Sequence, residues 1–202
     1  AIPVKQFSRK RNILMEKYYS LNKKNEIDEI YKKASNKDVL LIKKFKILKN
    51  LKFVEFPKLG LNELSKIIKK ISKLGGGLLL IDYGYLTPKN KNTLQSVIKH
   101  KKNKLLDNLG KADITSLVNF SLLYEHFIKN NLKVKKVVTQ KFFLERMEIL
   151  KRANNLSQKM SFKEQTNLYF RLKRLLDRKL MGNLFKVIFA YKSKKNNFLG
   201  FD

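Results

Sequence analysis

The fold class is decided by the stretch Gly75-Gly76-Gly77-Leu78-Leu79-Leu80-Ile81-Asp82-Tyr83-Gly84. Its continuous apolar run, residues 77–81, is typical of a strand that is buried on both faces of a parallel sheet. Just upstream, apolar residues recur at helical spacing after Asn62, which predicts a helix capped by Asn62 and ended by Gly75. A helix that leads directly into a buried strand predicts an α/β sheet with flanking helices.

The three glycines are interpreted as a turn and not as a phosphate-binding loop. Phosphate loops follow a strand and open a helix, so that the amides of the helix N-terminus face the anion. Here the glycines follow the predicted helix and precede the strand. Ligands of open α/β sheets bind beyond the carboxyl ends of the strands, where Asp82 and Tyr83 lie. Two interpretations of Asp82 stay open: it orients an amine, guanidine or ribose, or it accepts hydrogen bonds from loop amides.

Periodicity and capping signals predict the remaining elements. Helices are expected over 92–101, 120–130, 140–152 and 161–180, and strands over 52–56, 134–139 and 184–191. A β-hairpin or a pair of short helices fits residues 12–31, which contain the polar turn 22–25. Without repeats or low-complexity linkers, residues 1–202 predict one domain whose tail, 193–202, is frayed.

The composition excludes several kinds of site. Cysteine is absent, which excludes disulfides, thiolate zinc sites and a cysteine nucleophile. The sequence places no His/carboxylate cluster at metal-ligand spacing, so no metal site is predicted. No apolar run is long enough to span a membrane and no secretory signal is visible, so a cytoplasmic location is expected.

The formal net charge of +30 has two interpretations. A polyanionic partner such as RNA would explain it. A compositional bias toward Lys, Asn and Ile explains it as well, and is favoured because the basic residues are mostly Lys and are spread along the chain. The basic and aromatic segment 170–174 is similarly ambiguous, because it fits an RNA-binding face or a solvated helix with Phe170 in the core.

Several short segments carry a resemblance as an ordered set that spans almost the whole chain. They are Ile2-Pro3-Val4-Lys5-Gln6-Phe7, Leu80-Ile81-Asp82-Tyr83-Gly84-Tyr85, Thr93-Leu94-Gln95, His100, Gly110 with Ala112-Asp113-Ile114-Thr115, Val118-Asn119-Phe120, Thr139-Gln140 with Phe143-Leu144, and Met181-Gly182 with Phe185-Lys186-Val187. In this order they resemble the MidA-like family, which includes the mitochondrial complex I assembly-factor methyltransferases and their bacterial relatives.

The resemblance implies the C-terminal portion of a class I, Rossmann-like methyltransferase sheet with flanking helices. It implies S-adenosylmethionine as methyl donor and a protein side chain such as arginine, in a complex I subunit, as acceptor. The family's cofactor-binding half precedes the segment matched by Ile2-Pro3, so we expect a partial domain that begins inside a longer protein. Lys5 stands where many relatives have His, and Asn119 stands where they usually have Asp.

The site expected from the resemblance combines one catalytic residue with several substrate-binding residues. Asp82 is the candidate catalytic residue, because a carboxylate can pair with a guanidinium through two hydrogen bonds. The candidate substrate-binding residues are Tyr83, Gly84, His100, Asp113, Thr115 and Gln140, and Pro3 is the candidate cofactor contact. The alternative functions are a basic RNA-binding module and a non-catalytic interaction module.

Overall fold

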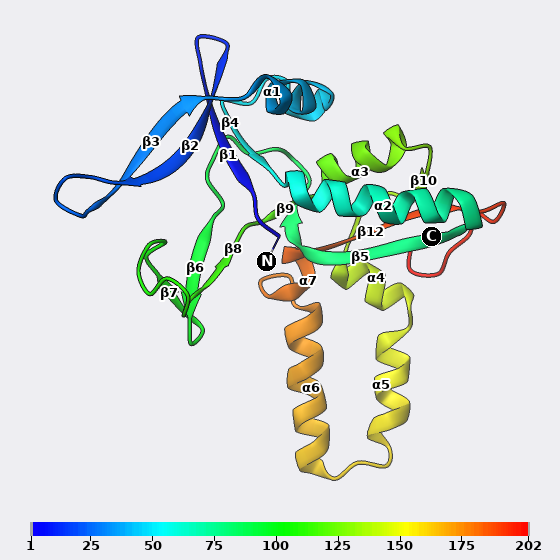
Figure 1. Cartoon of the computed structure of the whole chain (residues 1–202). Helices are drawn as coiled ribbons and strands as arrows, with labels where there is room; N and C mark the ends of the chain where they lie inside the picture. Colours follow the sequence, from blue (N-terminus) through cyan, green and yellow to red (C-terminus); the bar gives the residue numbers. More distant parts are fainter. Residues whose placement is uncertain (1, 202) are drawn as a thin grey trace. The chain divides into compact units, whose positions relative to one another are not determined.

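Residues 2–201 are described by a computed structural model, in which strands and helices are mixed along the chain (Figure 1). The predicted α/β class is confirmed. Contacts within the chain define two units, one of residues 1–67 and 87–117 and one of residues 68–86 and 118–202. The interpretation of residues 1–202 as a single partial domain stays a prediction, and its two end residues lie outside the described part.

The first unit contains a four-stranded antiparallel sheet in the order β3-β2-β1-β4. The strands are β1 (Lys5–Lys10), β2 (Ile13–Leu21), β3 (Ile27–Lys33) and β4 (Phe53–Phe56). Strands β2 and β3 form a hairpin, so the hairpin interpretation of residues 12–31 is correct. Asn22 explains the turn, because its side-chain oxygen accepts hydrogen bonds from the backbone amides of Lys24 and Glu26.

Helix α1 (Asn36–Lys43), the short 3-10 helix η1 (Lys46–Leu48) and the start of α2 (Lys58–Leu74) complete this part of the unit. The helix predicted to begin after Asn62 therefore starts earlier, directly after Pro57, whose fixed φ suits the entry to a helix. The core of the unit is apolar and includes Phe7, Ile42, Leu48, Val54 and Phe56, all nearly inaccessible to solvent.

A second sheet of the first unit has the order β7-β6-β8 and consists of β6 (Gln95–Ile98), β7 (Lys101–Asn103) and β8 (Asp113–Thr115). The helix predicted over 92–101 is therefore wrong. Lys99 and His100 both have positive φ and form the tight turn of a β6–β7 hairpin, which a helix cannot accommodate. Pairing of β6 on both edges outweighs the weak helical periodicity of this segment.

The sheet of the second unit is built on β12 (Phe185–Lys192), whose residues all pair antiparallel with β5 (Gly76–Tyr85). The other edge of β12 pairs with β10 (Lys133–Val134) and β11 (Val138–Thr139). Strand β9 (Val118–Asn119) runs parallel to β5 and pairs with its last two residues. The segment 134–139, predicted as one strand, thus contributes to two separate short strands, β10 and β11.

Strand β5 exists where the apolar run predicted a strand, but its surroundings differ from the prediction. Leu79 and Ile81 are 43% and 44% exposed, and the long neighbour of β5 is antiparallel. Among the described residues, only β9 pairs with the second edge of β5, and only at residues 84–85. The strand with fully buried residues on both faces is β12, where Val187 and Ile188 have no exposed surface.

The helices of the second unit are the end of α2, α3 (Phe120–Lys129), α4 (Gln140–Arg146), α5 (Ile149–Ser157), α6 (Phe162–Leu176) and α7 (Met181–Leu184). The helix predicted over 140–152 is interrupted, because Glu148 adopts a left-handed conformation between α4 and α5. The predicted capping box is confirmed: Glu164 accepts a hydrogen bond from the Ser161 amide at 2.8 Å and α6 follows.

Residues 193–202 are the segment expected to fray. Within it, the Phe198 ring lies 4.8 Å from the Phe189 ring and 4.7 Å from the Tyr191 ring, measured between centroids. Phe201 lies 5.3 Å from Phe143 of α4 in the same way. These aromatic contacts hold residues 198–201 against the sheet, and only the terminal residue falls outside the described chain.

Candidate functional site

The candidate catalytic residue, Asp82, lies near the end of β5, two residues before the pairing with β9 begins. Asp82 is exposed, and its Oδ1 accepts a hydrogen bond from the Tyr83 amide at 2.7 Å. One of the two interpretations, acceptance of a backbone amide bond, is therefore realised in the structure. A carboxylate has further lone pairs, so this bond leaves Asp82 able to accept donors from a ligand.

The strand register places polar side chains in a row on one face of the sheet. Asp82 of β5 is directly opposite Lys186 of β12, and Lys186 is directly opposite Thr139 of β11. Directly paired residues share a face, so the three side chains point to the same side. The Lys186 ammonium donates to the backbone carbonyls of Asn183 and Leu184. The face around Asp82 is therefore polar and carries both signs of charge.

The next pair along the strands is aromatic. Tyr83 is directly opposite Phe185, and the two ring centroids are 5.7 Å apart. Because Tyr83 alternates with Asp82, its ring lies on the other face of the sheet. The structure thus places the phenol and the carboxylate side by side along the backbone but on opposite faces.

Two further candidates of this unit have packing roles. A Cβ on Gly84 would lie 2.1 Å from the Val118 carbonyl oxygen, so only glycine permits the close pairing of β5 with β9. Gln140 is buried at the start of α4, and its Nε2 donates to the Leu175 carbonyl at 3.0 Å. This bond joins α4 to the end of α6. Substrate binding by Gly84 and Gln140 stays a prediction.

The remaining candidates belong to the first unit. His100 is exposed in the β6–β7 turn, and Asp113 is exposed on β8 opposite Val97. Thr115 is half-buried, and its Oγ1 accepts a hydrogen bond from Gln95 Nε2 at 3.2 Å. The sheet β7-β6-β8 therefore brings His100, Asp113 and Thr115 together on one small scaffold. Pro3 is exposed just before β1.

A partly buried polar network of the first unit was not predicted from the sequence. Glu55 accepts hydrogen bonds from Gln6 Nε2 at 2.9 Å, from the Thr93 amide at 2.9 Å and from the Thr93 hydroxyl. Gln6 also donates to Asn92 Oδ1 at 2.6 Å, and Thr93 Oγ1 accepts from the Leu117 amide at 3.0 Å. Gln6 and Thr93 belong to the resembling segments, which was the available signal.

A second buried cluster is ionic. Asp38 is 2% exposed and is paired with Lys58 at 2.6 Å and with Lys5 at 2.9 Å. Lys5 also reaches Glu16 at 2.8 Å, and the Ser35 hydroxyl donates to Asp38 at 3.0 Å. Lys5 thus joins two buried carboxylates, Asp38 and Glu16.

The cluster perturbs the ionisation of its members. Desolvation opposes the charged form of Asp38, but hydrogen bonds from Lys58, Lys5 and Ser35 outweigh it and lower the pKa of this carboxyl to about 2. Burial also disfavours the Lys5 cation, yet its bonds to Glu16 and Asp38 raise the pKa of Lys5. Both groups therefore stay charged throughout the physiological range.

Gly75 and the two glycines that begin β5 do not form a cofactor cradle. Gly75 ends α2 with φ +80°, and its amide donates to the Ile71 carbonyl at 2.8 Å. A Cβ on Gly77 would lie 2.6 Å from the Phe189 ring, so this glycine is needed for packing within the sheet. The turn interpretation of the three glycines is supported, and these residues do not fit the phosphate- or ribose-binding loop of a nucleotide cofactor.

Residues 2–201 contain neither a membrane-spanning helix nor a metal-binding cluster. No helix there is long and apolar enough to cross a membrane. The same residues include no group of three His, Asp or Glu side chains that could hold a metal ion.

The sequence of the chain matches a known protein family. Residues 1–138 match a family described as "Putative S-adenosyl-L-methionine-dependent methyltransferase". The chain belongs to this family. The resemblance inferred from the short segments is thereby confirmed, and the methyltransferase family match extends through the first unit to β11.

Curated relatives carry more specific names. The chain is 27% identical over 161 residues to a Caenorhabditis elegans protein named "Protein arginine methyltransferase NDUFAF7 homolog, mitochondrial". It is 30% identical over 124 residues to the Xenopus tropicalis protein named "Protein arginine methyltransferase NDUFAF7, mitochondrial". These matches cover 78% and 61% of this chain, but only 37% and 28% of the relatives.

Two crystal structures of proteins from Burkholderia thailandensis share the fold. The first gives a TM-score of 0.77 at 17% identity, and the second gives 0.71 at 18% identity. Each alignment covers 99% of this chain and about half of the solved chain, 53% and 51%. The second crystal structure contains bound S-adenosyl-homocysteine. The methyltransferase fold of this chain is therefore shown, over the part of the fold that it spans.

Proposed function

We propose that this chain supplies the acceptor-binding part of an S-adenosyl-L-methionine-dependent methyltransferase that acts on arginine side chains of a protein. Family membership supports the reaction class, and the names of the two curated relatives support a protein arginine as acceptor. The observation that carries the acceptor assignment is the exposed Asp82 carboxylate near the carboxyl end of β5.

The chemistry of Asp82 suits a guanidinium acceptor. A carboxylate and a guanidinium form two parallel charge-assisted hydrogen bonds, which fix the plane and orientation of the cation. Orientation matters because a methyl transfer needs the acceptor nitrogen in line with the departing group. Asp82 can also hold the proton that the methylated nitrogen releases, since carboxylates act as general bases. Asp82 would therefore serve the binding of the methyl acceptor and not the binding of the methyl donor.

The acceptor protein and the location of the chain form a finer part of the same proposal. The resemblance to the complex I assembly-factor methyltransferases leads us to propose a respiratory complex I subunit as acceptor. A cytoplasmic site of action is proposed for a bacterial member, whereas the curated relatives are named as mitochondrial. His100, Asp113 and Thr115 are proposed acceptor contacts that the sheet β7-β6-β8 presents together.

The proposal is tested with the longest reading frame that contains residues 1–202. The protein is incubated with S-adenosyl-L-methionine labelled in its methyl group and with purified complex I, and methylarginine is measured by mass spectrometry of acid hydrolysates. We expect Asp82→Asn to reduce methylarginine by about a hundredfold, in the range for loss of an orienting catalytic group. The matched control is Asp107→Asn, an exposed loop carboxylate, which should leave the rate within about twofold.

The two outcomes separate the residue assignment from the function. Unchanged methylation by Asp82→Asn would remove Asp82 from the site while leaving the activity in place. Absence of labelled arginine with the unsubstituted protein, under conditions where the complex I preparation is methylated by a known relative, would overturn the proposed function.

A further inference from the structure

Helices α5 and α6 form an arm, residues 149–176, that extends from the sheet of the second unit. Figure 1 shows the two helices running as a hairpin joined at its far end. Within the described chain, α6 has no buried residue and α5 has one, Ala153. Both helices nevertheless carry apolar side chains, among them Leu156, Phe162 and Phe170, which are 52%, 85% and 59% exposed. Apolar surface of this kind marks a site of interaction.

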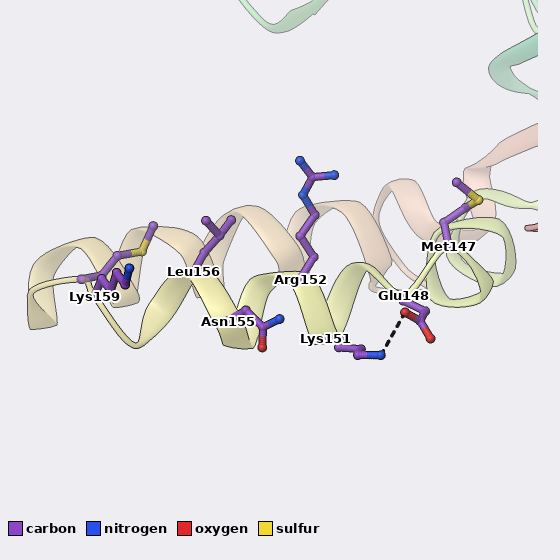
Figure 2. Close-up of a pocket in the computed structure, with 8 residues that line it drawn as sticks. Met147, Glu148, Lys151, Arg152, Asn155, Leu156 and Lys159 are labelled. Carbon is purple, nitrogen blue, oxygen red and sulfur yellow. Dashed lines mark ion pairs between the residues drawn. The ribbon is translucent and has the colours of Figure 1, made fainter.

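A groove runs along one side of α5 and has a volume of about 690 Å³ (Figure 2). Spacing by four residues along the helix produces two adjacent rows, one through Arg152 and Leu156 and one through Lys151 and Asn155. Both rows continue into the turn that ends the helix. The complete lining is Met147, Glu148, Lys151, Arg152, Asn155, Leu156, Lys159 and Met160.

The groove combines cations with aliphatic side chains. Its only carboxylate, Glu148, already pairs with Lys151 at 3.4 Å, the contact drawn in Figure 2. Arg152 and Lys159 form no ion pair with any residue of the described range 2–201. Leu156 and Met147 are about half exposed beside them, at 52% and 46%. The groove therefore presents positive charge next to apolar surface.

The arm together with its flanking residues carries a similar excess of positive charge. Residues 147–180 contain nine Lys and Arg and three Asp and Glu, a net charge of +6. The other two carboxylates serve the local backbone: Glu164 caps α6, and Asp177 accepts from the Lys179 amide at 2.7 Å. The Lys and Arg side chains of this segment therefore outnumber its carboxylates three to one.

We propose that this groove binds a segment of a partner protein in which carboxylates flank apolar side chains. The apolar lining is Leu and Met, which pack against aliphatic side chains, and Met adapts to their shapes. An amphipathic helix laid into such a groove would match its apolar row and place its carboxylates against Arg152 and Lys159.

A nucleic acid fits the arm less well. Single-stranded RNA is held by aromatic rings whose faces stack on bases. Two of the exposed rings of α6, Tyr169 and Phe170, contact each other edge to face, with an interplanar angle of 67° and centroids 5.7 Å apart. They do not form parallel stacking platforms, and no ring lines the groove itself.

The test uses the full chain and three fluorescent probes, with binding followed by anisotropy. The first is a peptide of about 18 residues, roughly 27 Å long as a helix, with Leu on one face and Glu on the other. The second has Gln in place of every Glu, and the third is single-stranded oligouridylate of similar length. We expect saturable binding of the Glu peptide and at least about tenfold weaker binding of the Gln peptide, because the Gln peptide cannot pair with the cations.

Substitutions then locate the site. Arg152→Glu should weaken the Glu peptide about tenfold, whereas Lys111→Glu, an equal charge reversal in an exposed loop of the first unit, should change it less than about twofold. Leu156→Ala should weaken it about fivefold, and Leu21→Ala, at a leucine of β2 that is 66% exposed, should not. These positions are exposed, so circular dichroism should show unchanged folding.

Any of three results would overturn the proposal. The first is no saturable binding of the Glu peptide, and the second is an equal loss of Glu-peptide affinity in Arg152→Glu and Lys111→Glu. The third is binding of oligouridylate that Arg152→Glu abolishes and that the Glu peptide does not displace. The second would show general attraction to a basic protein. The third would make the groove a nucleic-acid site.

Discussion

Replacing Asp38 by Asn should destabilise the first unit strongly. The pKa of this carboxyl is lowered from 3.8 to about 2, which corresponds to roughly 2.5 kcal/mol of stabilisation of the folded chain. Removing one member of a buried ion cluster also leaves Lys58 without its counter-charge and Lys5 with Glu16 alone, and breaking such a cluster typically costs about 3–5 kcal/mol. We therefore expect urea denaturation at pH 7 to show a loss of about 2–5 kcal/mol in the free energy of unfolding.

The pH dependence gives the sign of the effect. The folded-state pKa of Asp38 is lowered, so its stabilisation is fully present above pH 3.8 and is lost as the pH falls toward about 2. The difference in the free energy of unfolding between the unsubstituted chain and Asp38→Asn should therefore narrow as the pH falls from about 4 to about 2.

Glu63→Gln is the matched control for this measurement. Glu63 pairs with Lys66 at 2.7 Å, a distance similar to those in the buried cluster, but both side chains are about two-thirds exposed. An exposed pair contributes about 0–1 kcal/mol, so this variant should be nearly neutral. Equal effects of Asp38→Asn and Glu63→Gln, or an Asp38→Asn effect below about 0.5 kcal/mol, would refute the reasoning from burial.

Three other substitutions or conditions test separate parts of the fold. Gly84→Ala should lower the free energy of unfolding by about 2 kcal/mol or more in urea titrations, because the added Cβ would clash with the Val118 carbonyl oxygen; a neutral result would contradict the close β5–β9 pairing. Asn119→Ala removes the hydrogen bond from the Leu122 amide that caps α3, so thermal denaturation should show a loss of about 1 kcal/mol, and Asn119→Ser should restore most of it. Burial lowers the pKa of His126, so stability should be full above its ordinary pKa of about 6.5 and fall as the pH drops below it; NMR titration of the ring at or above pH 6.5 would contradict this.

The elements that could be predicted from sequence are those set by local chemistry. The capping box at Ser161, the Asn119 cap and the glycine that ends α2 each depend on hydrogen bonds within one turn of chain, and all three occur. The apolar run of β5 likewise predicted a strand. Its burial could not be predicted, because that depends on which strands pair with it.

The failures have the opposite cause. Residues 92–101 have weak helical periodicity. Part of the segment becomes strand β6 only because it pairs with β7, which follows a tight turn, and with β8, which lies further along the chain. The network around Glu55 joins residues separated by up to 86 positions, so no spacing rule could assemble it. For the candidate site, the position of Asp82 near the end of a strand could be predicted, but pattern could not show that Gly84 and Gln140 are engaged in packing.

The second edge of β5 has a consequence for how this chain behaves when isolated. Over residues 76–83 that edge pairs with no described strand, so its outward amide and carbonyl groups can accept a further strand. Protective features of natural edges, such as a proline or an inward-pointing lysine, are missing from Gly76–Tyr83, whose only charge is Asp82. We expect concentrated solutions to form oligomers through this edge, and a single lysine at the exposed Leu79 should keep the chain dispersed. Strand β5 would then be both the scaffold of the candidate site and the position most prone to aggregation.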